Sequence, residues 1–223
     1  MGKAVGDTLP LAIGVAISPV PVIAVILMLL SPRAPGTGVG FLAGWVVGVA
    51  VVVSVVSLLV GPATSDDSSG PSTTVSVLKV VLGVVALALA WREWRGRPRP
   101  GHPTGLPSWM SAIESMTPVR ATGLGALLAA VNPKNLTLCL AAGASIGGAG
   151  LNGGEGAVVV AVFVVVASST VAVPVIGYVA AGDRATRSLD DLRDWLTDNN
   201  ATVMSVLLLV IGAVILGQGV AGL

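Results

Sequence analysis

The sequence predicts an all-α membrane protein with six transmembrane helices, arranged as two inverted three-helix repeats with broken helices at spans one and four. Of the 223 residues, 54% are hydrophobic and only 10% are charged, with a mean hydropathy of +0.92. Soluble domains carry about 25% charged residues, so lipid must surround most of this chain. Two proline-containing motifs, Ser18-Pro19-Val20-Pro21 and Asn132-Pro133-Lys134-Asn135, interrupt two of the long apolar segments.

Six apolar stretches are long enough to cross a bilayer, for which about 20 helical residues are needed. They are Leu9–Leu30, Gly38–Val60, Val75–Trp94, Ala121–Ile146, Gly156–Ala181 and Ala201–Val220. We divide the chain into a first three-helix repeat over residues 1–95, a cytoplasmic basic loop with a short amphipathic helix over 96–120, and a second repeat over 121–223.

Basic residues between the spans indicate the orientation in the membrane. The links after spans one, three and five carry nine arginines: Arg33, Arg92, Arg95, Arg97, Arg99, Arg120, Arg184, Arg187 and Arg193. On the opposite side of the membrane, the only basic residue outside the spans is Lys3. Because cytoplasmic loops are enriched in Lys and Arg, we expect both termini outside the cell. The aromatic residues expected at the cytoplasmic interface are Phe41, Trp45, Trp91, Trp94, Tyr178 and Trp195.

The repeat hypothesis rests on the number of spans and on the two motifs. Three spans in each half is an odd number, so the second half must enter the membrane upside down relative to the first. The motifs lie 114 positions apart, which aligns Pro19 with Pro133. Helix breaks at matching depth in the two halves are the best sequence indication of the central site of a repeat-built transporter.

Around the motifs stand the polar groups of the predicted site. Each proline frees the backbone carbonyl four residues earlier, namely those of Val15, Ile17 and Ala129. Lys134 is the only ionisable residue near the middle of a span, where a charge usually marks a pathway or a ligand site. The predicted substrate-binding residues are Ser18, Pro19, Pro21, Ser54, Asn132, Pro133, Lys134, Asn135, Thr137 and Ser168.

Three roles for Lys134 follow from its position. Flanked by two asparagines and a helix break, its ammonium suits an anionic group such as a carboxylate, a sulfate or a phosphate. Alternatively, it satisfies the freed carbonyls and holds the two broken helices together. A role in proton coupling is the third alternative.

Two segments outside the spans have apolar residues at helical spacing: Leu106–Met116 and Ser188–Leu196. We expect each to form a short helix on the inner membrane face, and the alternative is a loop that packs its own apolar residues. Ser188 and Asp191 have the spacing of a capping box at the start of the second helix.

The sequence does not indicate an enzyme. No acidic residue lies in the core of any span, and neither a dinucleotide fingerprint nor a phosphate-binding loop is present. Cys139 and His102 are the only cysteine and the only histidine. We therefore expect no catalytic residues, no metal and no cofactor.

Three stretches carry a resemblance to a known family. They run from Ser18-Pro19-Val20-Pro21 to Ser31-Pro32-Arg33, from Pro107-Ser108-Trp109-Met110 to Met116-Thr117-Pro118, and from Ala129 through Asn132-Pro133-Lys134-Asn135 to Leu136. In these stretches the chain resembles the GAP family, the glycopeptidolipid- and sulfolipid-addressing proteins, within the LysE-like exporter superfamily. The resemblance implies a six-helix inner-membrane protein that takes part in exporting lipids or glycolipids to the bacterial cell envelope.

We therefore expect a transporter that exports or translocates an anionic lipid or glycolipid, with its headgroup held by Lys134, Asn132 and Asn135. The alternatives are a small-solute exporter of the amino-acid type and a non-transporting accessory subunit of a lipid-export machine. Expected partners are membrane lipids, the anionic lipid or small-molecule substrate, and other lipid-export proteins. A homo-oligomer is compatible with the sequence, and we expect no nucleic-acid partner.

The arginine asymmetry gives a topology that cysteine labelling can check. Single cysteines placed in the loop Asp66–Ser72 should react with an impermeant thiol reagent added outside intact cells. Cysteines at Gly101 or Asp191 should react only after the membrane is permeabilised. Equal labelling of all three sites in intact cells would overturn the orientation and the inverted-repeat argument with it.

Overall fold

The computed structural model is all-α and describes residues 1–63, 73–97, 113 and 116–223, with the side chains of residues 62, 63 and 183 left out. Within these ranges the elements are α1 (Gly2–Ala16), α2 (Pro19–Leu29), α3 (Ala34–Ala63), α4 (Thr73–Arg95), α5 (Pro118–Val131), α6 (Pro133–Gly147), α7 (Gly153–Ala181), the 3-10 helix η2 (Gly182–Ala185) and α8 (Thr186–Val220). Helices α3, α4, α7 and α8 are each long and apolar enough to span a membrane. The pairs α1–α2 and α5–α6 bring the total to as many as six spans.

Both predicted helix breaks are present. Helices α1 and α2 meet at 50°, and α5 and α6 meet at 68°. At each break one extended residue, Ser18 or Asn132, precedes a proline that opens the next helix. The residue before a proline is disfavoured in the helical region, and the proline itself fits the first helical position, so this order of residues ends one helix and begins another.

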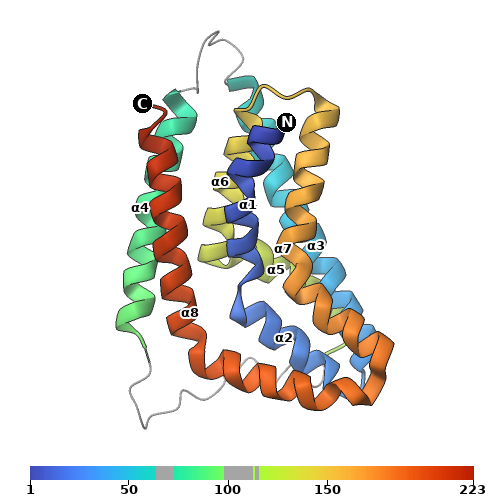
Figure 1. Cartoon of the computed structure of the whole chain (residues 1–223). Helices are drawn as coiled ribbons and strands as arrows, with labels where there is room; N and C mark the ends of the chain where they lie inside the picture. Colours follow the sequence, from blue (N-terminus) through green and yellow to red (C-terminus); the bar gives the residue numbers. More distant parts are fainter. Residues whose placement is uncertain (64–72, 98–112, 114–115) are drawn as a thin grey trace.

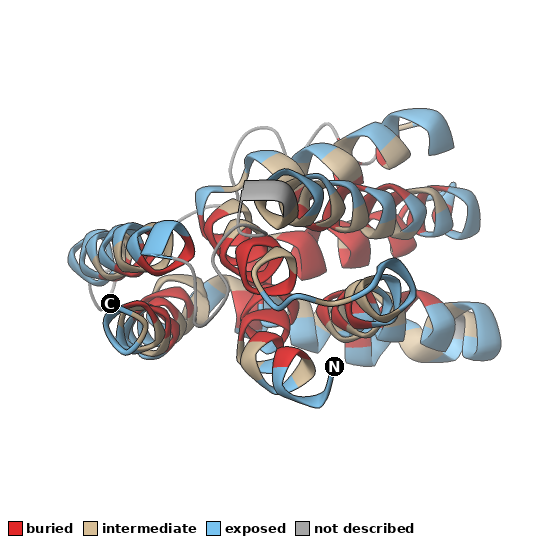
Figure 2. Cartoon of the chain, turned by 90° about the horizontal axis from the view of Figure 1, so that it is seen from above, coloured by how far each residue is buried: buried red, intermediate tan, exposed pale blue. Residues whose placement is uncertain are grey.

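One helix of each broken pair, α2 or α6, is largely buried inside the bundle. Helix α2 has nine of its eleven residues buried, and α6 has eleven of fifteen. Viewed along the bundle axis, the buried residues gather at the centre and the exposed ones face outward (Figure 2). Exposed apolar side chains on the surrounding helices include Leu58, Val165 and Val173, each about 70% accessible. Such an apolar outer surface is what lipid, as the surrounding solvent, requires.

Helix packing follows a simple arrangement (Figure 1). Helix α3 packs along α5 and α6, α7 packs along α1 and α2, and α4 and α8 pair with each other. Both termini lie at one end of the bundle, which we call the terminal end. The opposite end, where α4 ends and α8 begins, is called the basic end (Figure 1).

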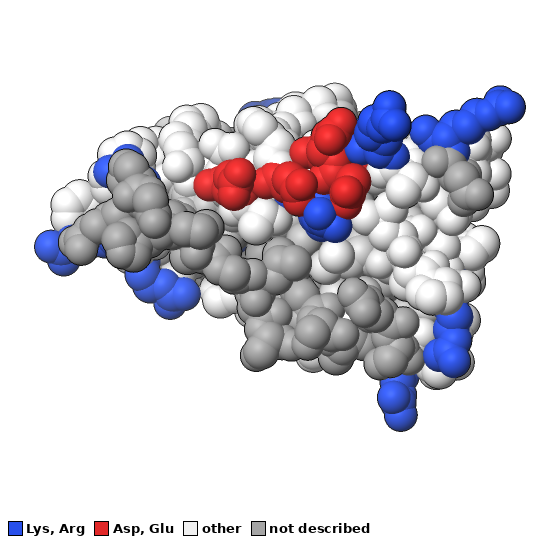
Figure 3. Space-filling model, turned by 90° about the horizontal axis from the view of Figure 1, so that it is seen from below, with Lys and Arg blue, Asp and Glu red and all other residues white. Residues whose placement is uncertain are grey.

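The amphipathic segment Ser188–Leu196 is helical, as predicted, but it is continuous with the last span in α8. This first part of α8 runs crosswise beneath the bundle at the basic end (Figure 1). It buries Leu189 and Leu196, and it carries a row of aspartates on its solvent side, Asp190, Asp191, Asp194 and Asp198 (Figure 3). Arg193 pairs with the first and third of them.

The predicted capping box is wrong. Helix α8 begins at Thr186, directly after η2, so Ser188 lies inside the helix, and the N-cap residue Ala185 makes no side-chain cap. A capping box exists instead at the start of α7, where Asn152 and Glu155 bond reciprocally. The other predicted amphipathic segment, Leu106–Met116, lies outside the described residues except for its buried Ile113 and its last residue.

The predicted aromatic belt is wrong for two of its members. Phe41 and Trp45 are completely buried, whereas Trp91, Trp94 and Trp195 are between 43% and 61% exposed. The buried pair lies on α3 where that helix meets α5, so these two rings fill the core and do not anchor the protein at a membrane surface.

Glycines bring α3 and α5 into close contact. Three of them recur every four residues on the face of α3 that meets α5: Gly40, Gly44 and Gly48. A Cβ atom at Gly44 would collide with the carbonyl of Thr122 on α5. One at Gly125 on α5 would lie 2.9 Å from the backbone nitrogen of Trp45. Small residues at this spacing let the backbones of membrane helices approach closely.

We predict that Gly44→Ala lowers the free energy of unfolding by about 1–3 kcal/mol, because the added methyl group forces two backbones apart. Gly123→Ala on α5 is the matched control, since its Cβ would meet nothing within 4 Å. The control should be neutral or slightly stabilising, because alanine is the better helix former. Thermal unfolding of the purified variants in one detergent makes the comparison, and equal effects would contradict the close crossing.

Candidate functional site

The two proline motifs meet through Lys134. This residue lies in the first turn of α6, and its Nζ donates hydrogen bonds to the carbonyl oxygens of Gly14 at 2.7 Å and Ile17 at 3.1 Å. The lysine is only 2% exposed. Its ammonium therefore contacts the C-terminal end of α1 across 117 to 120 positions of sequence.

The local sequence explains why these carbonyls accept the ammonium. Pro21 has no N–H, so the carbonyl of Ile17 has no helical donor four residues later. The N–H of Ser18 turns back to the carbonyl of Ala16 at 2.7 Å, which leaves the carbonyl of Gly14 for Lys134. A helix C-terminus also carries a partial negative charge that attracts a cation. The prediction that Pro21 frees the carbonyl of Ile17 is thus confirmed. The carbonyl of Gly14 is a second acceptor, which the sequence did not indicate.

A second side chain binds the same helix end. The hydroxyl of Thr170 on α7 donates to the carbonyl of Ala16. Sequence reasoning did not select Thr170, although it follows the predicted residue Ser168 by two positions in a polar Ser-Ser-Thr run. The broken end of α1 is consequently bound from two sides, by α6 and by α7.

Two predicted site residues make local bonds at the second break. The Oδ1 of Asn132 accepts a hydrogen bond from the backbone nitrogen of Lys134 at 3.1 Å, which caps α6. The hydroxyl of Thr137 donates to the carbonyl of Pro133 at 2.7 Å. The Pro133 ring itself is exposed. These contacts stabilise the start of α6.

Three other predicted residues are buried without a partner among the described residues. They are Ser18, Asn135 and Ser168, and each is at most 4% exposed. In Asn135 both the amide nitrogen and the amide oxygen lack a partner. Ser18 lines the break itself, Asn135 follows Lys134 in the first turn of α6, and Ser168 lies on α7 two positions before Thr170. Buried polar groups without partners are uncommon, so each one calls for an explanation, and a ligand or water that binds them is one.

A pocket of about 290 Å³ lies beside this break. Ile17, Ser18 and Thr170 line it together with Pro174 of α7 and Leu196 of the crosswise part of α8. We call it the break pocket. Its walls are almost entirely apolar, and Leu196 links the break to the amphipathic segment at the basic end, a connection that the sequence did not indicate.

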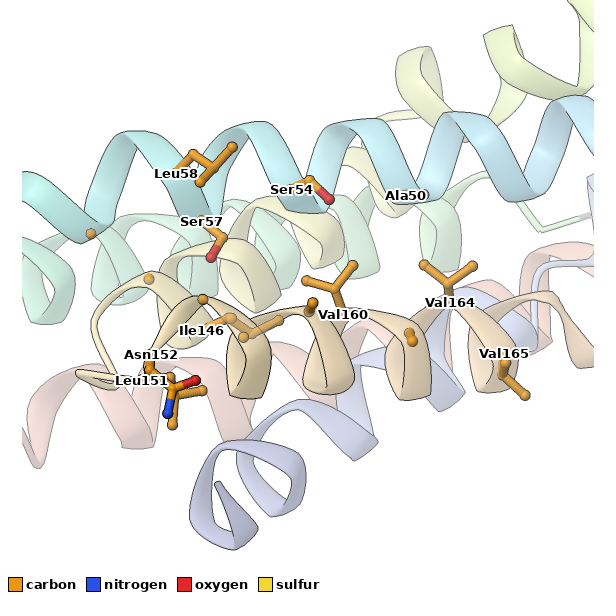
Figure 4. A pocket seen from close by; sticks show the side chains of 16 residues that line it. Ala50, Ser54, Ser57, Leu58, Ile146, Leu151, Asn152, Val160, Val164 and Val165 are labelled. Atoms are coloured by element: carbon orange, nitrogen blue, oxygen red, sulfur yellow. The ribbon is translucent and has the colours of Figure 1, made fainter.

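A larger cavity of about 650 Å³ lies between the second half of α3 and the first half of α7, nearer the terminal end (Figure 4). We call it the α3–α7 groove. Ser54 and Ser57 of α3 line one side and Val160 and Val164 of α7 line the other, with Asn152 at the end (Figure 4). Ser54 therefore faces this groove and does not contribute to the cluster around Lys134.

The α3–α7 groove is open to the outside of the bundle. Its lining includes Leu58 and Val165, which are 73% and 70% exposed. Most of the lining is apolar: Ala50, Leu58, Gly61, Ile146, Gly147, Leu151, Gly153, Gly156, Ala157, Val160, Ala161, Val164 and Val165. Its polar lining residues are Ser54, Ser57 and Asn152.

In the described part of the chain, no three His, Cys, Asp or Glu side chains are grouped so that they could hold a metal ion. Cys139 is a buried free thiol in α6. His102 lies outside the described residues.

These features define a multi-span α-helical membrane protein built around discontinuous helices. They are the apolar helices of spanning length, the two broken pairs and the buried lysine between the breaks. The chain belongs to the family of Sap, the sulfolipid-1-addressing protein, whose model matches residues 8–221. This match confirms the resemblance seen in the sequence motifs. No curated protein and no solved structure matches the chain.

We predict that Lys134→Met lowers the melting temperature, because the carbonyls of Gly14 and Ile17 lose their donor inside a buried region. An unsatisfied buried polar group costs about 1–3 kcal/mol. Lys79→Met is the matched control, since Lys79 is a second lysine within a span and makes no hydrogen bond or ion pair in the described residues. Its melting temperature should stay near that of the wild type. A Lys134→Met protein as stable as this control would contradict the structural role.

Proposed function

We propose that the protein exports an anionic lipid or glycolipid across the membrane toward the cell envelope. The observation that carries the proposal is the α3–α7 groove, a cavity of about 650 Å³ with exposed apolar residues at its margin. A lipid path needs a lateral opening between helices, so that acyl chains remain in contact with the bilayer while the headgroup moves. A small-solute exporter needs a closed vestibule instead.

The chemistry of the groove supports an amphiphilic substrate. Val160, Val164 and Leu58 offer apolar surface to acyl chains. Hydroxyl groups from Ser54 and Ser57 supply donors and acceptors along the same path, and each points toward α7 (Figure 4). The family description, sulfolipid-1-addressing protein, agrees with a lipid that carries a polar, charged head.

The buried cluster at the break supports recognition of the headgroup. Asn135 offers two unpartnered amide atoms, and Ser18 and Ser168 offer unpartnered hydroxyls. An anionic headgroup that reached this cluster would find these donors beside the ammonium of Lys134 and the cap residue Asn132. We propose that Lys134 holds the helix break closed between transport events and meets the headgroup only when α1 moves away from α6.

Packing supports the inverted-repeat plan and the division into residues 1–95 and 121–223. Helix α3 packs along α5 and α6 in the way that α7 packs along α1 and α2. Helix α4 contacts α6, and α8 contacts α2 in the corresponding way. Two halves inserted in opposite directions produce such a correspondence, and their substrate site lies where the broken helices meet. With termini outside, the α3–α7 groove would face the outer leaflet.

Lipid movement in reconstituted vesicles tests the proposal, with variants that block or spare the α3–α7 groove. We predict that the wild-type protein carries a fluorescent lipid with a sulfated headgroup between leaflets, and that Ala161→Trp abolishes this movement by filling the groove. Val158→Trp is the matched control, because Val158 lies within one turn of Ala161 on α7, is 49% exposed and does not line the groove. Loss of fluorescence after adding a membrane-impermeant quencher measures the lipid that has reached the outer leaflet.

The outcomes separate the three functional hypotheses. Movement of labelled amino acids without movement of lipid would replace the proposal with small-solute export. No movement of either by the folded wild-type protein would favour an accessory subunit. Equal loss of lipid movement in Ala161→Trp and Val158→Trp would show that the α3–α7 groove is not the lipid path.

A further inference from the structure

A third cavity, of about 510 Å³, lies between α4 and α8 toward the basic end, and we call it the α4–α8 groove. Leu87, Ala90, Trp91 and Trp94 of α4 line one side, and Ser205, Val206 and Leu209 of α8 line the other. It shares no lining residue with the α3–α7 groove. Figure 1 shows α4 and the upright, C-terminal part of α8 standing together on one side of the bundle, away from α3.

Two arginines lie against the aromatic wall of this groove. The guanidinium of Arg95 lies 5.3 Å from the centre of the Trp91 ring, and that of Arg97 lies 3.4 Å from the centre of the Trp94 ring. Stacking on a ring fixes the plane of a guanidinium and leaves its N–H groups directed outward, where they can bind a phosphate. The two tryptophans thus position two cations at the mouth of an apolar groove.

Nearby acids do not neutralise these cations. The salt bridges in the described residues join Lys3 to Asp7 and Arg193 to Asp190 and Asp194, all away from the groove. The end of α4 carries Arg92, Arg95 and Arg97 against one carboxylate, Glu93, which leaves two net positive charges there.

Only one kind of partner matches both parts of the groove. The apolar walls lie between two helices of membrane-spanning length, so hydrocarbon chains are the natural occupant. The arginines require negative charge at the level of the lipid headgroups, where tryptophan side chains are also enriched. Basic pockets between membrane helices at the cytoplasmic side bind anionic lipid headgroups.

We propose that the α4–α8 groove is a binding site for an anionic phospholipid of the membrane, with its phosphate on Arg95 and Arg97 and an acyl chain between Trp91 and Leu209. This lipid is a resident ligand of the basic end and is distinct from the exported substrate, which we place at the α3–α7 groove and the helix break. It would fix the α4–α8 pair relative to the membrane surface.

Native mass spectrometry of the purified full-length protein tests the site, with phosphatidylglycerol and phosphatidylcholine as the two probes. We expect the wild type to bind phosphatidylglycerol more tightly, by roughly tenfold to thirtyfold, as two arginines at a membrane surface provide. The double variant Arg95→Gln/Arg97→Gln should lose this preference. Both side chains are exposed, so the variant should fold normally.

Two further variants distinguish a built site from general attraction. Arg184→Gln/Arg187→Gln removes two exposed charges from the same end of the bundle and should keep the wild-type preference. Val206→Trp fills the groove while retaining both arginines and should weaken phosphatidylglycerol binding.

Three outcomes would overturn the proposal. In the first, both arginine double variants lose the preference for phosphatidylglycerol equally. In the second, Val206→Trp binds phosphatidylglycerol as the wild type does. In the third, a dimer mass disappears with Val206→Trp while lipid binding persists. The last would assign the groove to a second copy of this chain.

Discussion

The contact between the Lys134 ammonium and the broken end of α1 is the interaction on which the centre of this protein depends. A helix that ends inside a bilayer leaves carbonyl groups without donors, and each such group costs several kcal/mol in hydrocarbon. A lysine at the same depth is also costly when its charge has no partner. Bringing the two together reduces both costs, because the ammonium donates to Gly14 and Ile17 at the negative end of a helix. Neither the broken end of α1 nor the buried ammonium would be stable there alone.

The helices around this centre pack tightly on some sides and loosely on another. On one side, glycines of α3 and α5 allow backbone contact, and Gly143 of α6 approaches the backbone of Val53 on α3 in the same way. On the other side, α7 faces α3 with valines and alanines, and the α3–α7 groove lies between them. Tight packing on two faces of α3 therefore leaves its third face as the place where a lipid can enter. Residue size along one helix decides where the bundle is closed and where it is open.

Sequence reasoning predicted the long apolar helices, the positions of both breaks and the family, because hydrophobic length and proline chemistry are local properties. It could not identify the acceptors of Lys134, which lie 117 to 120 positions away, or the contact of Thr170 with Ala16. Periodicity fails in helices that are apolar on every face, so Phe41 and Trp45 were expected at an interface although they are buried. For the same reason Ser54 was grouped with Lys134, whereas it lines a separate groove.

The buried position of Lys134 has a consequence for the proposed export. An ammonium that is 2% exposed and bonded to two carbonyls can meet a headgroup only after α1 and α6 separate. The carbonyls of Gly14 and Ile17 then need other donors, and water that accompanies a polar headgroup can supply them. An apolar molecule brings no such donor and cannot stabilise the opened break. The same two hydrogen bonds would therefore keep the path closed in the resting protein and select for substrates with hydrated, charged heads.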